Sequence, residues 1–374
     1  MGRVLPLLLL VALLAPMTLL FVQAWRLTAD DRDLADRERL GVEYLRALAP
    51  VTHALVDAQS AAVAARPATS AALTNAVEAA ASVDARVGDE LRTRERWAGL
   101  RARIEALSAR GPADPEAAFA AYGEATDLLL ALHGKVRETS GLIRDPRPDS
   151  FFLQHGARDL PEAVVAAGRL ADLTVLAADR PTADRNRTTA EAAALRVSVL
   201  VPADDLVTDL RAAVENSQSA DLGSIVLAPL DTYQRSVEAL AAHSAPAGRA
   251  TAANQAQVVD ARRESQTAAN RLLPLVLDEL DTLLAERIDA SNRDRRLTVA
   301  AGVLAALLWA GLVGGWLAAA RRRPARPRDG AQPAAVPPED TPWPPTDAEP
   351  RRLQPAGAAR EAGTTQWGRF DAAR

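Results

Sequence analysis

The sequence predicts an all-α protein, an elongated up-and-down helical bundle held between two transmembrane helices. Three observations lead to this prediction. The 374 residues are rich in alanine, leucine and arginine, which have high intrinsic helix propensities. Apolar residues recur at helical spacing over long stretches. Two apolar runs, Val4–Val22 and Leu297–Ala320, bracket the chain, and a run of roughly 20 such residues is long enough to cross a bilayer.

Basic residues flank the outer ends of both apolar runs. Because positive charges stay on the cytoplasmic side, both termini are expected to be cytoplasmic, and residues 1–24 to be a cytoplasmic start followed by the first transmembrane helix. The sequence thus predicts a two-pass plasma-membrane protein with its central region extracytoplasmic. Cleavage after Ala24, as in a signal peptide, stays an alternative. The flanking residues are Arg3 on one side and Arg321, Arg322, Arg323, Arg326 and Arg328 on the other.

Residues 25–180 are expected to form a first helical bundle. Apolar residues recur every seven positions from Leu27 to Ala62, which predicts one long helix to about Arg66, with a kink or a break at Pro50. Turns rich in proline and glycine separate the helices that follow. These helices are expected over residues 70–108, 116–143 and 150–179, with Asp149 or Ser150 capping the last of them.

Residues 181–296 are expected to form a second helical segment. Helices are predicted over 182–200 and 204–218, separated at Pro202, and over 222–243. The last helix begins near Thr251, has a seam of coiled-coil type from Leu273 to Ile288, and continues into the second transmembrane run at 297–320. At 1.5 Å per residue it would be roughly 100 Å long. Two stacked bundles and one elongated bundle both fit this pattern.

The second apolar run contains Gly311-Leu-Val-Gly-Gly315. Small residues four apart let two membrane helices approach closely, so Gly311 and Gly315 are candidate contacts of a homodimer. The frequency of small residues in any alanine-rich span explains the same pattern.

Residues 321–374 are expected to be a disordered cytoplasmic tail, because they are rich in proline and arginine and poor in large aliphatic residues. The tail is too short and too polar to be a kinase or a cyclase. Its arginines next to the membrane attract anionic lipid head groups, although setting the topology explains them equally well. Pro342-Trp-Pro-Pro345 is a candidate docking segment for a cytoplasmic protein through extended-proline recognition.

The candidate ligand-binding residues are aromatic and basic. Pockets between bundle helices are lined by apolar and aromatic groups, and arginine receives a carboxylate through two hydrogen bonds. Core packing for the phenylalanines and simple solvation for the arginines are the alternatives. His155 and Asp159 share a helical face but are too few to hold a metal. The candidates are Tyr44, Arg144, Arg147, Phe151 and Phe152.

Two segments resemble the all-helical extracytoplasmic sensor domains of bacterial chemoreceptors and diguanylate cyclases. They are Asp145-Pro-Arg-Pro-Asp-Ser-Phe-Phe-Leu-Gln154, followed by Leu160-Pro161, and the earlier Arg39-Leu-Gly-Val-Glu-Tyr-Leu45. The resemblance covers about residues 25–300 and implies a sensor-like fold. The chain departs from it in Pro148, where leucine is usual, and in Phe151-Phe152, where a tyrosine pair is usual. It also lacks a HAMP linker and an output module.

Two functions fit this sequence. The first is a membrane-anchored sensor-like receptor that binds an extracytoplasmic signal or partner and passes a conformational change through the second span to a separate cytoplasmic partner. The alternative is a non-signalling structural or scaffold protein of the cell envelope. No catalytic motif, cofactor site or metal site is present in the sequence, so an enzyme is not expected. Nucleic-acid binding is not expected either, because the central region is acidic.

Overall fold

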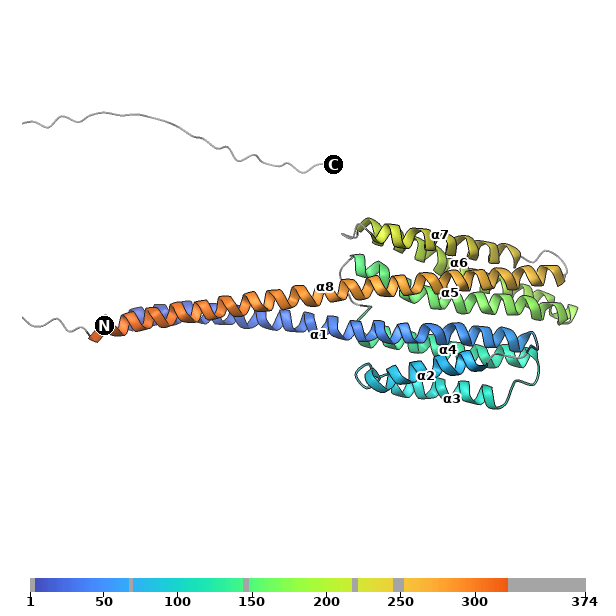
Figure 1. Ribbon diagram of the computed structural model, residues 1–374, viewed down its shortest axis with the longest axis horizontal. Coiled ribbons are helices and arrows are strands. Elements are labelled where there is room, and N and C mark those ends of the chain that lie inside the picture. Colours follow the sequence, from blue (N-terminus) through green and yellow to red (C-terminus); the bar gives the residue numbers. More distant parts are fainter. Residues whose placement is uncertain (1–3, 67–69, 144–147, 217–220, 245–251, 322–374) are drawn as a thin grey trace, which may run out of the picture. The chain divides into compact units, whose positions relative to one another are not determined.

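The computed structural model describes residues 4–66, 70–143, 148–216, 221–244 and 252–321, with the side chains of residues 4–15 and of a few other helical positions left out. The described residues are helical and contain no strand, which confirms the all-α prediction (Figure 1). The α-helices are α1 (Val4–Val63), α2 (Ser70–Val87), α3 (Arg94–Ala109), α4 (Pro115–Ser140), α5 (Pro148–Asp179), α6 (Arg185–Asn216), α7 (Leu222–His243) and α8 (Ala252–Arg321), with a short 3-10 helix at Thr182–Asp184.

The helices up to Val313 pack into one compact unit around a shared apolar core. Helix α1 packs against α2, α4 and α5, while α3 packs on α4, α6 on α5, and α7 on α6. Helix α8 lies beside α1 in the opposite direction, and the two extend together past the other helices (Figure 1). The first and last helices therefore share a long face, although they are far apart in the sequence.

The predicted helix over residues 70–108 is wrong, because the chain turns between α2 and α3. Asp84 is buried, and its Oδ1 accepts a hydrogen bond from Thr93 Oγ1 at 2.9 Å. A side chain at Gly88 would collide with Asp84, so the turn requires glycine there. Arg92 adopts a positive φ of 51°, which a helix does not contain. The buried Asp84 thus stabilises a turn between α2 and α3 that the spacing of apolar residues did not predict.

Prolines break the described helices less than the sequence suggests. Helix α1 is continuous through Pro50, and α6 is continuous through Pro202, so the predicted break at Pro202 is wrong. A proline removes one helical hydrogen bond, and packing of the flanking turns offsets that loss. Helix α5 begins at Pro148, before both residues predicted to cap it, so neither Asp149 nor Ser150 is the N-cap.

Candidate functional site

Tyr44, one of the predicted ligand-binding residues, lies in the core of the helical unit. Its side chain is fully buried, and its hydroxyl donates a hydrogen bond to Asp84 Oδ1 at 2.8 Å. Burial, followed by the bond to Asp84, raises the pKa of Tyr44. The hydroxyl thus joins α1 to the last turn of α2.

Phe151 and Phe152 lie at the start of α5, beside α6. Phe151 is 40% exposed, and its ring meets that of Phe152 edge to face at 5.5 Å. The Phe151 ring also lies 4.3 Å from that of His155, whose Nδ1 is 2.9 Å from Asp209 Oδ2 on α6. These contacts differ from those of Tyr44, so the described hydrogen bonds and ring contacts do not join the predicted aromatic residues into one site. Arg144 and Arg147 lie outside the described residues.

Two neighbouring grooves lie along the face between α1 and α8. The first, with a volume of about 490 Å³, is polar and basic. Its lining includes Arg66 just beyond α1, with Arg262 and Arg263 on α8. The other lining residues are Asp57, Ser60, Ala61, Gln266, Thr267 and Asn270. We call this the basic groove.

The second groove, of about 570 Å³, is lined mainly by apolar side chains from α1, α2 and α8. It shares Asp57 and Asn270 with the basic groove, so the two are adjacent stretches of the same face. Both are open to solvent along the surface. We call this the apolar groove. Its apolar lining consists of Ala49, Pro50, Ala54, Ala72, Ala76, Leu273, Pro274 and Leu277.

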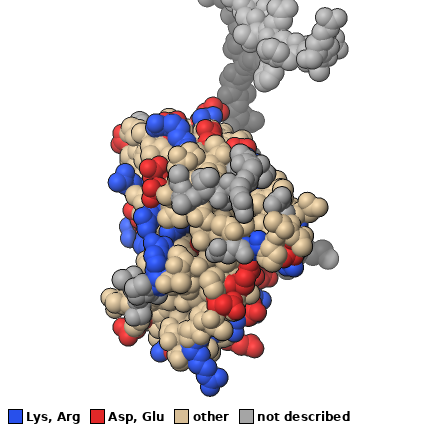
Figure 2. Space-filling view, turned by 90° about the vertical axis from the view of Figure 1, so that its right-hand side faces the viewer, with Lys and Arg blue, Asp and Glu red and all other residues tan. Residues whose placement is uncertain are grey.

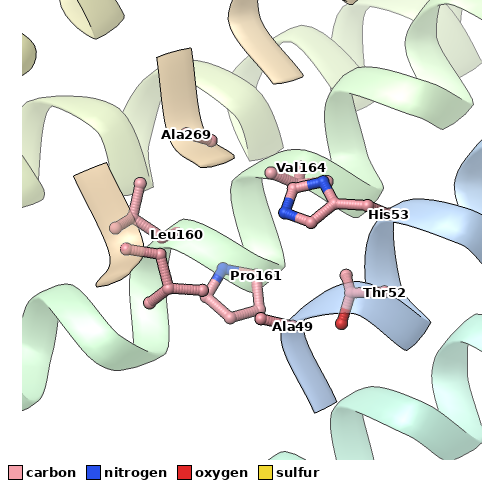
Figure 3. Close-up of a pocket in the computed structure, with 8 residues that line it drawn as sticks. Ala49, Thr52, His53, Leu160, Pro161, Val164 and Ala269 are labelled. Atoms are coloured by element: carbon pink, nitrogen blue, oxygen red, sulfur yellow. The ribbon is translucent and has the colours of Figure 1, made fainter. Parts of the chain in front are cut away.

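His53 connects the apolar groove with the interior. It also lines a closed gap where α1, α5 and α8 meet, opposite Pro161 and Val164 (Figure 3). The gap does not admit a water molecule. Burial lowers the pKa of His53 to about 4, so its imidazole is neutral at pH 7. A ligand in the apolar groove would therefore touch a side chain that is packed on α5.

Buried polar side chains lie beneath the basic groove. Gln59 Nε2 donates a hydrogen bond to Asp172 Oδ2 at 2.8 Å, which joins α1 to α5. Burial raises the pKa of Asp172 to about 6, although Ser60, Gln59, Arg262 and Arg66 favour its charged form. The basic groove thus lies over a carboxyl group that titrates near neutral pH.

Arg262 occupies the floor of the basic groove. Its side chain is 5% exposed, and its Nη1 lies 3.0 Å from Asp57 Oδ1 and 2.6 Å from Gln266 Oε1. Gln266 Nε2 in turn donates to the backbone oxygen of His53 at 3.2 Å. Because the exposed Asp57 and the buried Gln266 hold it on two sides, the guanidinium has a fixed position.

Charged pairs join α1 and α8 further along the same face, and we call three of them the ion-pair ladder. Arg46 Nη2 lies 2.7 Å from Asp278, and Arg39 contacts both carboxylate oxygens of Asp281, at 2.8 Å and 3.3 Å. The third pair is Glu38 and Arg287, 3.3 Å apart, with 0% and 9% of their side chains exposed. A shift of one helical turn between α1 and α8 would separate all three pairs.

Aromatic contacts join α1 and α8 beyond the ladder. The Arg295 guanidinium lies 4.4 Å from the centre of the Trp25 ring, a cation–π contact. The Phe21 ring packs directly over Gly302, where an added Cβ would lie only 2.6 Å away. Leucines on this part of α8 are nevertheless exposed: Leu297, Leu304, Leu307, Leu308 and Leu312 are 59–66% exposed.

Helix α8 is, among the described residues, the helix long and apolar enough to cross a membrane. Most side chains of the first apolar run lie outside the described ones, so that span stays a prediction. Gly311 and Gly315 have no described side chain within 4 Å of an added Cβ. The basic cluster from Arg321 to Arg328 and the tail lie outside the described side chains.

No protein-family model, curated protein or solved structure matches this chain. The resemblance to sensor domains therefore stays a prediction. The described residues hold no group of three side chains suited to bind a metal.

The grooves were not predicted from the sequence, because their walls come from opposite ends of the chain. The sequence does contain one sign of the basic groove. Arg262, Ser265 and Gln266 are polar but lie on the buried face of α8, where the following turns have alanine and leucine.

Proposed function

We propose that the protein is a two-pass membrane receptor whose helical body lies outside the cytoplasm and whose α1 and α8 both continue into the bilayer. The observation that carries this proposal is the exposed apolar surface of α8 from Leu297 to Leu312. A helix that is apolar on several sides is stable in water only when other parts of the protein cover it. Lipid would cover these side chains instead.

Charges on both sides of the apolar stretches support the orientation. Arg3 and the cluster from Arg321 to Arg328 lie at the ends expected to be cytoplasmic. On the other side, Trp25 and Arg295 pair where α1 and α8 leave the apolar stretches. Tryptophan and arginine are stable at a membrane–water boundary, where an apolar ring and a charged group are both accommodated.

The position of the grooves supports a receptor function. They lie between α1 and α8, the same two helices that would enter the membrane. A ligand that bridges these helices would bias their relative position directly, and shifts of about 1–2 Å between packed helices are a known form of switching. The receiver would be a cytoplasmic protein that binds the tail, and a second copy of the chain would pack at Gly311 and Gly315.

The rival function is a structural or scaffold protein of the cell envelope. The ion-pair ladder favours it in one respect, because three charged pairs hold α1 and α8 in a fixed register. A rigid spacer would keep the distance between α1 and α8 unchanged whatever occupied the grooves. A receptor would change that distance.

Thiol labelling tests the membrane topology. The chain has no cysteine, so a single introduced cysteine is the sole reactive thiol. Ser198 is exposed on α6, and Thr364 lies in the C-terminal segment. In sealed right-side-out vesicles, a membrane-impermeant maleimide should label Ser198→Cys at once and Thr364→Cys only after detergent is added. Labelling of both variants, or of neither, in intact vesicles would overturn the topology.

A further inference from the structure

We propose that the α1–α8 face binds an amphipathic organic monoanion, with a carboxylate in the basic groove and an apolar body in the apolar groove. This deepens the proposed receptor function by naming the class of its ligand. The inference rests on the lining of the two grooves, on their shared wall at Asp57 and Asn270, and on how each charged side chain is already paired.

The basic groove has an excess of positive charge. Its walls carry three guanidinium groups, those of Arg66, Arg262 and Arg263, against the carboxylate of Asp57. Arg262 pairs with Asp57 at 3.0 Å, and Arg263 pairs with Asp260 at 3.6 Å while its side chain remains 54% exposed. Figure 2 shows that basic and acidic side chains are unevenly distributed over this end of the helical body. With three guanidinium groups in its lining, the groove would attract an anion.

The end of α1 directs Arg66 toward this groove. Ala65 has a positive φ of 49°, and Arg66 N donates to the Ala61 oxygen at 2.8 Å. Ala65 N donates to the Ala62 oxygen at 3.1 Å. These two bonds form a Schellman motif, in which glycine normally holds the left-handed position. The motif turns the chain back across α1 and brings Arg66 to the groove that Arg262 and Arg263 line.

The apolar groove accounts for the rest of the ligand. From Arg262 to Leu277, α8 rises roughly 22 Å, so the two grooves together suit an elongated molecule. Arg46 lines the far end of the apolar groove, but it is paired with Asp278 at 2.7 Å. One guanidinium and one carboxylate balance there, whereas the basic groove has three guanidinium groups in its lining. The face thus matches a molecule with one anionic head, rather than a polyanion or a molecule charged at both ends.

Soluble probes test this inference on the full chain in nanodiscs of phosphatidylcholine. We expect 3-phenylpropanoate to raise the melting temperature in a saturable way, because binding to the folded state alone stabilises as ln(1 + [L]/Kd). The neutral amide of the same acid, acetate and citrate should have much weaker effects. Equal effects of the acid and its amide, a preference for citrate, or no saturable response to 3-phenylpropanoate or octanoate would overturn the proposal.

Matched variants locate the site. Arg66→Gln and Arg263→Gln should each weaken binding about tenfold, because each removes a charge-assisted hydrogen bond. Arg235→Gln, at an exposed residue of α7 outside the grooves, should leave binding unchanged. Ala72→Leu should fill the apolar groove and abolish binding, whereas Ala71→Leu, at its exposed neighbour, should not. Unchanged melting without ligand would show that each variant is folded. If the groove variants bound 3-phenylpropanoate as tightly as the control variants Arg235→Gln and Ala71→Leu, the ligand would not bind at the α1–α8 face.

Spin labels separate the ligand proposal from the receptor proposal. Cysteines at Arg37 and Asp289, both exposed, report the distance between α1 and α8 beside the ladder. Bound 3-phenylpropanoate should change that distance by about 1–2 Å. Binding without any change would leave the ligand class standing and remove the receptor function. Absence of binding would remove the ligand class, while the thiol-labelling result would still decide the topology.

Discussion

Removing one partner of the Glu38–Arg287 pair should cost far more stability than removing one partner of the other pairs of the ladder. Both side chains are nearly or fully buried, and their charged groups lie 3.3 Å apart. Removing one partner of a buried ion pair typically costs about 3–5 kcal/mol, because the other charge stays buried without it. We therefore expect Arg287→Leu and Glu38→Leu each to cost about 3–5 kcal/mol.

A double-mutant cycle by urea unfolding of the full chain, followed by circular dichroism, measures this. Glu38→Leu combined with Arg287→Leu leaves no unpaired charge from this pair, so the double variant should be more stable than the sum of the single costs predicts, by about 2–3 kcal/mol. The exposed pair of Arg46 and Asp278 is the control, with a coupling of about 0–1 kcal/mol. Additive costs at Glu38 and Arg287 would refute a direct, buried contact between α1 and α8 at this place.

Three further predictions concern the helical body. In urea unfolding, Asp172→Asn should stabilise the fold by about 1–3 kcal/mol at pH 8 and have little effect at pH 3.5. The reason is the raised pKa of Asp172, about 6 in the folded protein: the wild-type protein loses stability as the pH rises from about 4 to 6 and the buried carboxyl group ionises. Gly41→Ala should cost about 1–3 kcal/mol in the same assay, since its Cβ would collide with the end of α4, whereas Gly99→Ala meets open space and should not destabilise. Phe152→Ala should lower the melting temperature more than Phe151→Ala, because the Phe151 ring is 40% exposed and Phe152 packs against the core; the reverse order would contradict this packing.

Helix positions were largely predictable from local signals. Turn residues and apolar spacing gave α4, α7 and the start of α8 to within a few residues. The wrong predictions concern helix ends, and the spacing of apolar residues does not report the contacts that decide them. Asp84 breaks the helix between α2 and α3 through a buried hydrogen bond, while Pro202 stays helical because its flanking turns remain packed.

The candidate site was much less predictable. Tyr44 looked like a pocket residue because aromatics are rare in this chain, but its hydroxyl is bound to Asp84 in the core. The grooves depend on Arg66 and Arg262, which are almost 200 positions apart, and no periodic pattern within a helix reports on a pairing over that distance. Only the structure, in which α1 and α8 pack antiparallel, places Arg66 and Arg262 in the same groove.

Cross-linking between α1 and α8 at the expected membrane boundary is the most direct test of whether both helices enter the bilayer together. Phe21→Cys with Gly302→Cys places two thiols where the Phe21 ring now packs on the glycine. A control pair, Phe21→Cys with Gly311→Cys, lies roughly 13 Å further along α8. In native membranes, a short bifunctional thiol reagent should join the first pair within one chain, so that fragments stay linked after proteolysis, and should leave the control pair unlinked. Absence of this cross-link, or a mature chain that lacks residue 21 because the first run is cleaved, would contradict a receptor anchored through both helices.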